Sequence, residues 1–265
     1  MSTNPRQDNI LRLVINLDRS PKRLELITKQ LSALGLSFER VAAIDGRKMK
    51  PEALERFEAP YDDPRKCIFR YALQPTEIAC FLSHAACWQR LVESDAEWGL
   101  VMEDDVAISP RFKQFAASSD WIPEGVRIAQ LHGYPQSSFT VAERYPVRDT
   151  ELLRIVWPTP NGCLAYLIHR EAAAWALANY RPMPSPVDDW MFTPYSDFAK
   201  LFPPHRLLAA CVTTRDDIPS DIGNRVQRRP QPTSTKVRVL RRLKKCGYRF
   251  EALFQKKRRA VLTYE

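Results

Sequence analysis

Glycine is scarce in this sequence, with 8 residues among 265, whereas proline is plentiful, with 21. So few glycines argue against a glycine-rich loop that cradles phosphates through its backbone. The chain also lacks any apolar run close to the ~20 residues that cross a bilayer, so we expect no transmembrane helix. Residues 1–9 are polar and do not resemble a secretory signal, and we therefore expect a cytoplasmic protein.

The six cysteines include no CxxC pair. Most of them stand in apolar surroundings; Cys80, for example, directly precedes Phe81. An even number of cysteines would allow three disulfides. Because no secretory signal is present, reduced thiols are the favoured interpretation.

The positive charge of the chain is concentrated near its C-terminus. The formal net charge is +9, yet residues 236–259 contain eleven Lys and Arg against a single acid, Glu251. The rest of the chain is therefore close to neutral, and the basicity belongs to an appendage. This distribution weakens an assignment to the nucleic-acid-binding proteins, and we expect no nucleic-acid partner.

The N-terminal part of the chain has the pattern of a strand, a helix and a second strand. Residues 11–17 form a short apolar run typical of a buried strand, and residues 37–44 form the next. Between them, Ser20 and Pro21 favour a helix start and Gly35 favours its end. Such a unit is the opening of an α/β fold.

The same alternation continues further along the chain. Thr76 is expected to cap a helix that runs to about Glu93, and an apolar strand is expected at 98–102. Further strands are expected at 127–131, 152–156 and 163–168, with a helix at 171–180. We therefore predict an α/β fold with a mostly parallel sheet covered by helices.

Three consecutive acids, Glu103, Asp104 and Asp105, directly follow the strand predicted at 98–102. Repulsion among neighbouring carboxylates favours a divalent ion that spreads the charge, and oxygen ligands select Mg²⁺ or Mn²⁺ rather than zinc. Ligands of open α/β sheets gather at the carboxyl ends of strands, where this triplet stands. An ion there would neutralise a departing diphosphate. A solvated acidic turn is the alternative.

Other polar residues stand at corresponding places and are expected to meet the acidic triplet at one edge of the sheet. They end the first two strands or lie in the helix that precedes the third: Asn16, Asp18, Asp45, Gly46, Ser83 and His84. The motifs that contain them are VINLDRSPKR, AIDG, EIACFLSHAACW and LVMEDDVAIS. In order and spacing these motifs resemble glycosyltransferase family 25, the lipopolysaccharide galactosyltransferase family. Weaker downstream blocks extend the resemblance over residues 10–223.

The resemblance implies a GT-A-like nucleotide-binding fold, a UDP-sugar donor (usually UDP-galactose), Mn²⁺ (or Mg²⁺) and inversion at the anomeric carbon. Carried over by position, Glu103 and Asp105 would hold the metal and the diphosphate, and Asp104 would orient the donor sugar. The residues near the nucleotide would be Asn16, Asp18, Arg23, Asp45 and Gly46. Many family members have glycine where this chain has Ala79, which places a methyl group beside the donor pocket.

An inverting transfer needs a base on the acceptor side, opposite the departing diphosphate. Asp188 is the preferred candidate and Asp189 the second. The alternative is that Asp188 caps a short helix.

His84 is a candidate contact to the donor or the metal, although a lone histidine on an apolar helix face is more often a core residue. His132 and His205 are further candidates for metal or phosphate contacts. The residues that would stack on an acceptor sugar, unless they belong to the core, are Tyr134, Trp157 and Trp190.

The domain organisation follows from the same patterns. Residues 1–225 are expected to form the GT-A-like glycosyltransferase domain, 226–235 a linker and 236–265 a basic amphipathic helical tail. Solvated charge and a nucleic-acid contact are alternatives for the tail. Attachment to an anionic membrane surface is favoured, because apolar residues recur at helical spacing among the basic ones. A lipid-linked acceptor at the cytoplasmic face of the inner membrane would explain such a tail.

The predicted function is transfer of a hexose, galactose first, from a UDP-sugar to a lipopolysaccharide, lipooligosaccharide or other glycan acceptor. A non-catalytic relative that binds sugar nucleotides or glycans is the main alternative. The intact acidic triplet argues against it, because such a cluster is costly without a metal. A glycosidase is a weaker alternative, because no second carboxylate pair is evident.

Overall fold

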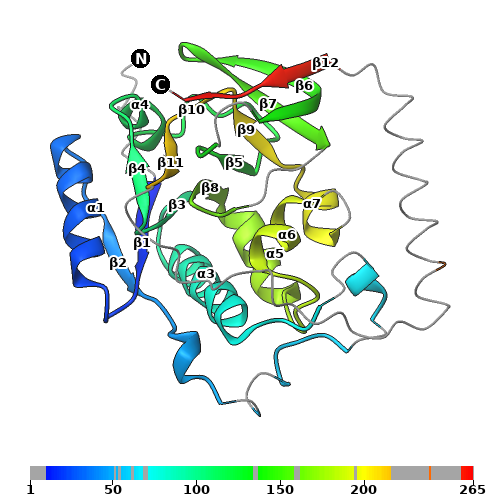
Figure 1. The fold of residues 1–265 in the computed structure, drawn as a ribbon. Coiled ribbons are helices and arrows are strands. Elements are labelled where there is room, and N and C mark those ends of the chain that lie inside the picture. Colours follow the sequence, from blue (N-terminus) through cyan, green and yellow to red (C-terminus); the bar gives the residue numbers. More distant parts are fainter. Residues whose placement is uncertain are drawn as a thin grey trace.

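The computed structural model describes residues 10–50, 52, 55–60, 63–67, 71–133, 137–157, 162–193, 196–215, 239 and 258–264. Helices and strands alternate along this part of the chain (Figure 1). The strands are β1 (Ile10–Asn16), β2 (Glu39–Ala42), β3 (Trp98–Glu103), β4 (Val106–Ile108), β5 (Ile128–Gln130), β6 (Ser138–Val147), β7 (Thr150–Trp157), β8 (Ala165–His169), β9 (His205–Leu207), β10 (Ala209–Ala210), β11 (Val212–Thr214), β12 (Arg258–Val261) and β13 (Thr263–Tyr264). The helices are α1 (Pro21–Ala33), η1 (Gly46–Lys48), η2 (Pro64–Cys67), α3 (Pro75–Glu93), α4 (Phe112–Ala116), α5 (Arg170–Asn179), α6 (Val187–Phe192) and α7 (Asp197–Leu201).

The central sheet is mixed. Its nine strands follow the order β12-β6-β7-β9-β5-β8-β3-β1-β2. The β2–β1, β1–β3 and β5–β9 pairs are parallel, and the other neighbours are antiparallel. The α/β class is therefore confirmed, but the prediction of a mostly parallel sheet is wrong, because five of the eight neighbouring pairs are antiparallel. One reason is the β6–β7 hairpin, which closes through a tight turn and needs no crossover helix.

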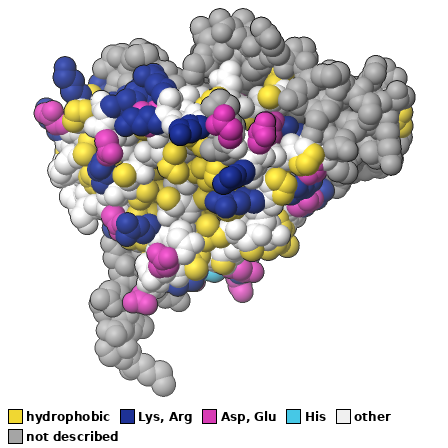
Figure 2. Space-filling model, turned by 90° about the horizontal axis from the view of Figure 1, so that it is seen from below, with side chains coloured by type: hydrophobic (Ala, Val, Ile, Leu, Met, Phe, Trp, Pro, Cys, Tyr) yellow, Lys and Arg dark blue, Asp and Glu magenta, His cyan; other side chains and the backbone are white. Residues whose placement is uncertain are grey.

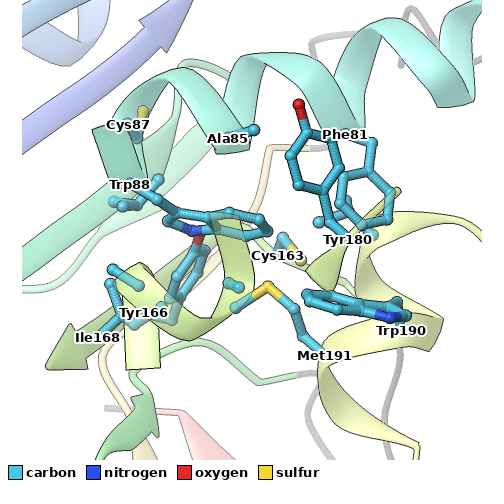
Figure 3. Packing of buried hydrophobic residues seen from close by; sticks show 14 of the residues in the cluster. Phe81, Ala85, Cys87, Trp88, Cys163, Tyr166, Ile168, Tyr180, Trp190 and Met191 are labelled. Atoms are coloured by element: carbon cyan, nitrogen blue, oxygen red, sulfur yellow. The ribbon is translucent and has the colours of Figure 1, made fainter. Parts of the chain in front are cut away.

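Helices cover both faces of the parallel edge (Figure 1). Alternate residues of β1 point to opposite faces, as the period of a strand requires. Leu13 and Ile15 belong to the core beneath α3, α5 and α6, whereas Val14 packs with Ile27 and Leu31 of α1. The first of these cores is rich in aromatic rings, and Figure 3 shows several of them around α3. Two packed layers thus hold β1 and β3 firmly. β3 ends at the acidic triplet, and β1 ends beside it at Asn16.

The start of α3 differs from the prediction. The helix begins at Pro75 with Gln74 at its N-cap, so the assignment of the cap to Thr76 is wrong. Gln74 and Glu77 form a reciprocal capping box, in which the Gln74 backbone N–H donates to Glu77 Oε2 over 2.9 Å. Proline at the first helical position has no N–H to satisfy and a backbone angle suited to a helix, which explains the earlier start.

The C-terminal end of the chain also differs from the prediction. Residues 258–264 form β12 and β13, which pair with β6 and β10, so the helical prediction for the tail is wrong there. Ala260 and Leu262 are buried with Phe139 and Val141 of β6. The last strands therefore complete the body of the fold. The linker at 226–235 and most of the predicted amphipathic helix lie outside the described residues.

Two further expectations concern cysteines and membranes. The cysteines whose side chains are described, Cys80, Cys87, Cys163 and Cys211, are all free thiols, as expected. None of the helices in the described ranges is both long and apolar enough to cross a membrane.

On the face shown in Figure 2, Lys and Arg side chains are interspersed with Asp and Glu side chains around a hydrophobic centre. This mixture fits a body of nearly neutral charge.

Candidate functional site: a cleft at the ends of the parallel strands

A cleft of about 100 Å³ lies where β1, β2 and β3 end, beside the first turns of α3. A pocket for a drug-sized ligand usually measures about 300–1,000 Å³, so this cleft encloses only part of a nucleotide sugar. Most of the predicted site residues line it. They are Arg23, Asp45, Gly46, Ser83, His84, Glu103, Asp104 and Asp105, joined by Arg19, Ile44, Ala79 and Cys80.

Asp104 is held by two elements that the sheet brings together. The parallel register places Ile15 of β1 beside Glu103 of β3, so the next residues of the two strands also meet. Asn16 Nδ2 donates to Asp104 Oδ2 over 2.6 Å, and Arg23 on α1 lies 3.3 Å from Oδ1. Burial raises the pKa of Asp104, and these two partners lower it again in part. The contacts fix the carboxylate at the wall of the cleft.

Asp105 is the most strongly perturbed member of the triplet. Burial and then the charges of Glu103 and Asp104 raise its pKa to about 7, against a smaller opposing effect of Arg23 at 4.0 Å. Its Oδ1 atom is buried and has no hydrogen-bond partner among the described residues. Arg23 therefore compensates only part of the negative charge of the triplet, and a cation would supply the rest. The solvated acidic turn considered from the sequence does not describe this arrangement.

His84, on α3, lies beside Glu103, the first acid of the triplet. It is fully buried, and its Nε2 atom lies 3.6 Å from Glu103 Oε1, beyond hydrogen-bond distance. Its Nδ1 atom lies 2.9 Å from the Tyr166 hydroxyl, which also accepts from Trp88 Nε1. Figure 3 shows Trp88 directly against Tyr166. His84 therefore differs from an ordinary core histidine, because only Nδ1 has a hydrogen-bond partner among the described residues. The other ring nitrogen, Nε2, is buried beside Glu103 at the cleft.

Cys80 stands one helical turn before His84 and was not predicted from the sequence as a site residue. Its Sγ atom, His84 Nε2 and a Glu103 carboxylate oxygen all lie within 4.8 Å of one another. Burial, followed by the charges of Glu103 and Asp188, raises the pKa of the Cys80 thiol well above its ordinary value. Cys80 and His84 are four positions apart on a helix, which places them on one face, and this spacing is the signal that the sequence contained.

The turn after β2 forms the opposite wall. Asp45 caps η1 by accepting from the Arg47 backbone N–H, and Arg19 Nε donates to its other oxygen over 3.1 Å. These bonds outweigh the effect of burial and lower the pKa of Asp45. A Cβ on Gly46 would lie 2.6 Å from the Pro75 carbonyl oxygen, so only glycine allows η1 to approach α3 this closely. Ser83 Oγ accepts from the Ile44 backbone N–H over 2.9 Å and ties the turn to α3.

Two of the residues predicted near the nucleotide do not line the cleft. Asn16 supports it from behind through Asp104. The Asp18 side chain is 80% exposed and pairs with Arg40 instead. Arg19, one position further along, points into the cleft and was missed, because two neighbouring residues of a turn cannot be assigned to different sides from the sequence alone.

The candidate base Asp188 lies close to the cleft but does not line it. It is buried in the first turn of α6, and its Oδ2 atom accepts from the Gly162 backbone N–H over 3.1 Å. The N-cap of α6 is Pro186, so the alternative of Asp188 as the cap is wrong. Its charge acts on the Cys80 thiol, which places it on the α3 side of the site. Asp189 is also in this turn, half-buried.

The remaining candidates lie elsewhere. His132 is buried between Ala165 and Arg206, and His205 is buried in β9; neither lines the cleft. Trp190 packs against Phe81 and other rings of the core (Figure 3), so the core interpretation holds for it. Tyr134 and the side chain of Trp157 lie outside what the structure describes.

Comparisons with known proteins give a consistent result. Residues 9–191 match the family described as Glycosyltransferase family 25 (LPS biosynthesis protein). A protein of Drosophila pseudoobscura named Glycosyltransferase 25 family member is 33% identical over 38% of this chain and 16% of its own length. Lipooligosaccharide biosynthesis protein lic2B of Haemophilus influenzae is 26% identical over 60% of this chain and 59% of its own length. Procollagen galactosyltransferase 2 of mouse is 31% identical over 38% of this chain and 16% of its own length. The aligned part therefore spans about a sixth of the two animal relatives.

Proposed function

The chain belongs to glycosyltransferase family 25, and from this membership we propose that it transfers a hexose from a UDP-sugar to a lipopolysaccharide, lipooligosaccharide or other glycan acceptor. Galactose is the first candidate, because one relative is named a galactosyltransferase. The name of another supports a lipooligosaccharide acceptor. The observation that carries the proposal is the position of Asp104 and Asp105 in one cleft with Arg23, at the carboxyl ends of parallel strands.

The residues present fit a divalent ion, Mn²⁺ or Mg²⁺. Asp105 has a buried oxygen without a hydrogen-bond partner among the described residues, and Glu103 stands beside it, so these two would hold the ion. When bound, the ion neutralises the charge that develops on the departing diphosphate. Asp104, fixed by Asn16, accepts hydrogen bonds from the donor sugar, and Arg23 attracts the phosphates.

The parallel edge of the sheet is proposed as the nucleotide-binding half of a GT-A-like fold. The turns that follow β1, β2 and β3 all contribute to the cleft, through Arg19, Asp45 and Asp104. Ile44 stands at the mouth of the cleft with 40% of its surface exposed, where it offers an apolar contact to a flat base.

Asp188 is proposed as the base of an inverting transfer. Replacing Asp188 with Asn should abolish transfer while leaving UDP binding intact, because the amide keeps the acceptor oxygen for the Gly162 N–H but cannot take a proton. The matched control is Asp189→Asn in the same turn. If the Asp188 variant turns over at a near-normal rate and the Asp189 variant does not, Asp189 is the base instead.

The function is tested by incubating the chain with UDP-galactose, UDP-glucose and other UDP-sugars in the presence of Mn²⁺ and measuring released UDP. The proposal predicts release with at least one donor, and its loss after chelation or in Asp104→Asn. Binding of a sugar nucleotide without any release, with and without glycan acceptors, would favour the non-catalytic relative instead.

A peripheral position on the cytoplasmic face of the inner membrane is proposed from the charge of the tail. Residues 236–257 carry nine Lys and Arg and one acid, and a basic residue near an anionic surface contributes about 1 kcal/mol to binding. The test is sedimentation with anionic and neutral vesicles, comparing the chain with a variant in which those nine residues are Gln. The variant keeps β12 and β13. Equal binding of both proteins to anionic vesicles would contradict the proposal.

A further inference from the structure

A sulfur, a nitrogen and an oxygen ligand meet on the floor of the cleft. Cys80 and His84 lie one turn apart on the same face of α3, and Glu103 ends β3 opposite them. Their candidate ligand atoms are all within 4.8 Å of one another. In a tetrahedral site with bonds of 2.0–2.3 Å, ligand atoms lie about 3.3–3.8 Å apart. The His84–Glu103 separation of 3.6 Å already fits, and any longer separation, up to 4.8 Å, has to shorten by at most about 1 Å. The Glu103 side chain is 23% exposed and has room to turn.

The orientation of His84 supports a ligand at this place independently of the spacing. The residue is completely buried, and Nε2 has no hydrogen-bond partner within the described ranges. An unpaired polar nitrogen in such surroundings costs free energy unless something binds it. The ring is held by Tyr166 at Nδ1, and Tyr166 is in turn held by Trp88. Metal-binding histidines are commonly fixed in this way through their second nitrogen.

We propose that Cys80, His84 and Glu103 bind a divalent ion of the zinc class, with the fourth position open to the cleft. A thiolate and an imidazole select Zn²⁺ or Co²⁺ over Mg²⁺, so this site differs in ligand chemistry from the oxygen site formed with Asp105. On binding, the Sγ–H proton of Cys80 passes to solvent and an Sγ–metal bond forms. His84 keeps one proton, on Nδ1, and this N–H group donates a hydrogen bond to the Tyr166 oxygen.

The inference shares Glu103 with the proposed function but does not depend on it, because it requires neither a donor sugar nor turnover. An open fourth position suits a phosphate or hydroxyl oxygen, as it does in zinc sites of enzymes. An ion held there would also occupy Glu103 and so alter the neighbouring oxygen site.

The test uses Co²⁺, whose bond to a thiolate absorbs in the near ultraviolet. The full-length chain should develop this absorption with one equivalent of Co²⁺ and lose it when Zn²⁺ is added. Cys80→Ser and His84→Gln should lose the band, whereas the control Cys87→Ser should keep it. Cys87 is buried on the same helix and belongs to no candidate metal-binding group among the described residues. A band that persists in Cys80→Ser would overturn the proposal.

X-ray absorption of the Zn²⁺-loaded wild-type chain needs no variant, so it decides the matter even if a substitution prevents folding. The proposal predicts one sulfur at about 2.3 Å together with nitrogen and oxygen neighbours. A shell of nitrogen and oxygen alone would overturn it. UDP release with Mn²⁺ is measured separately, so failure of the zinc-class site and failure of the transferase proposal give different results.

Discussion

Replacing Asp105 with Asn should make the ion-free chain more stable at alkaline pH, although it removes a proposed ion ligand. Burial and the neighbouring charges of Glu103 and Asp104 raise the pKa of Asp105 from 3.8 to about 7. Asparagine has nearly the same shape and cannot ionise. The variant therefore removes the cost of a buried, uncompensated negative charge while keeping the packing.

The sign and size follow from proton linkage. Between pH 3.8 and about 7 the folded chain keeps a proton on Asp105 that the unfolded chain has lost, so the free energy of unfolding falls as the pH rises through this window. A shift of that size corresponds to at most about 4 kcal/mol at pH 8, at 1.36 kcal/mol per pH unit. Below pH 4 the contribution vanishes, because both states are protonated.

The assay is urea unfolding in the presence of EDTA at pH 5 and pH 8. We expect Asp105→Asn to be more stable than the wild-type chain by up to about 1.6 kcal/mol at pH 5, which lies about 1.2 pH units into the window, and by up to about 4 kcal/mol at pH 8. Asp95→Asn, an exposed residue of the turn before β3, is the control and should change nothing. Adding Mn²⁺ should stabilise the wild-type chain more than the variant. A variant that is less stable at pH 8, or equally shifted at both pH values, would refute the reasoning.

Three other expectations concern the scaffold. Burial lowers the pKa of His205 to about 4, so between pH 4 and 6.5 only the unfolded chain binds a proton at this residue. The free energy of unfolding should therefore fall by up to about 3 kcal/mol as the pH is lowered from 6.5 to 4. In urea titrations, His205→Asn should show a weaker pH dependence. Gly46→Ala should cost about 1–3 kcal/mol and weaken UDP binding, because its Cβ meets the backbone of Pro75; an unchanged unfolding midpoint would contradict this. Deleting residues 258–265 should lower the melting temperature, because it uncovers Phe139 and Val141; full retention would show that β12 contributes nothing.

The local elements of the N-terminal half could be predicted because their signals are contained in short segments. An apolar run marks β1, Pro21 starts α1, and Gly35, at φ 69°, ends it. The meeting of Asn16 with Asp104 followed from placing both at the ends of parallel strands, which is a rule of the fold class. These signals do not depend on distant partners.

The rest depends on contacts between distant segments. β6 contains Pro146, which argues against a strand in sequence, and its pairing with β7 and β12 is visible only in three dimensions. The basic residues near the C-terminus suggested a helix to its end, whereas Ala260 and Leu262 are buried against the sheet. The spacing of Cys80 and His84 could be read from the sequence, but the approach of Glu103 from another element is visible only in the structure.

The measurement that tests the central claim most directly is calorimetric titration of the chain with UDP, with and without Mn²⁺. The claim is that the carboxylates of Glu103 and Asp105, gathered in the cleft, serve to bind a nucleotide's diphosphate through a divalent ion. It predicts binding of one UDP per chain that requires Mn²⁺ and is lost in Glu103→Gln and Asp105→Asn, with Asp95→Asn unaffected. Binding of equal strength without the ion, or in all three variants, would contradict it.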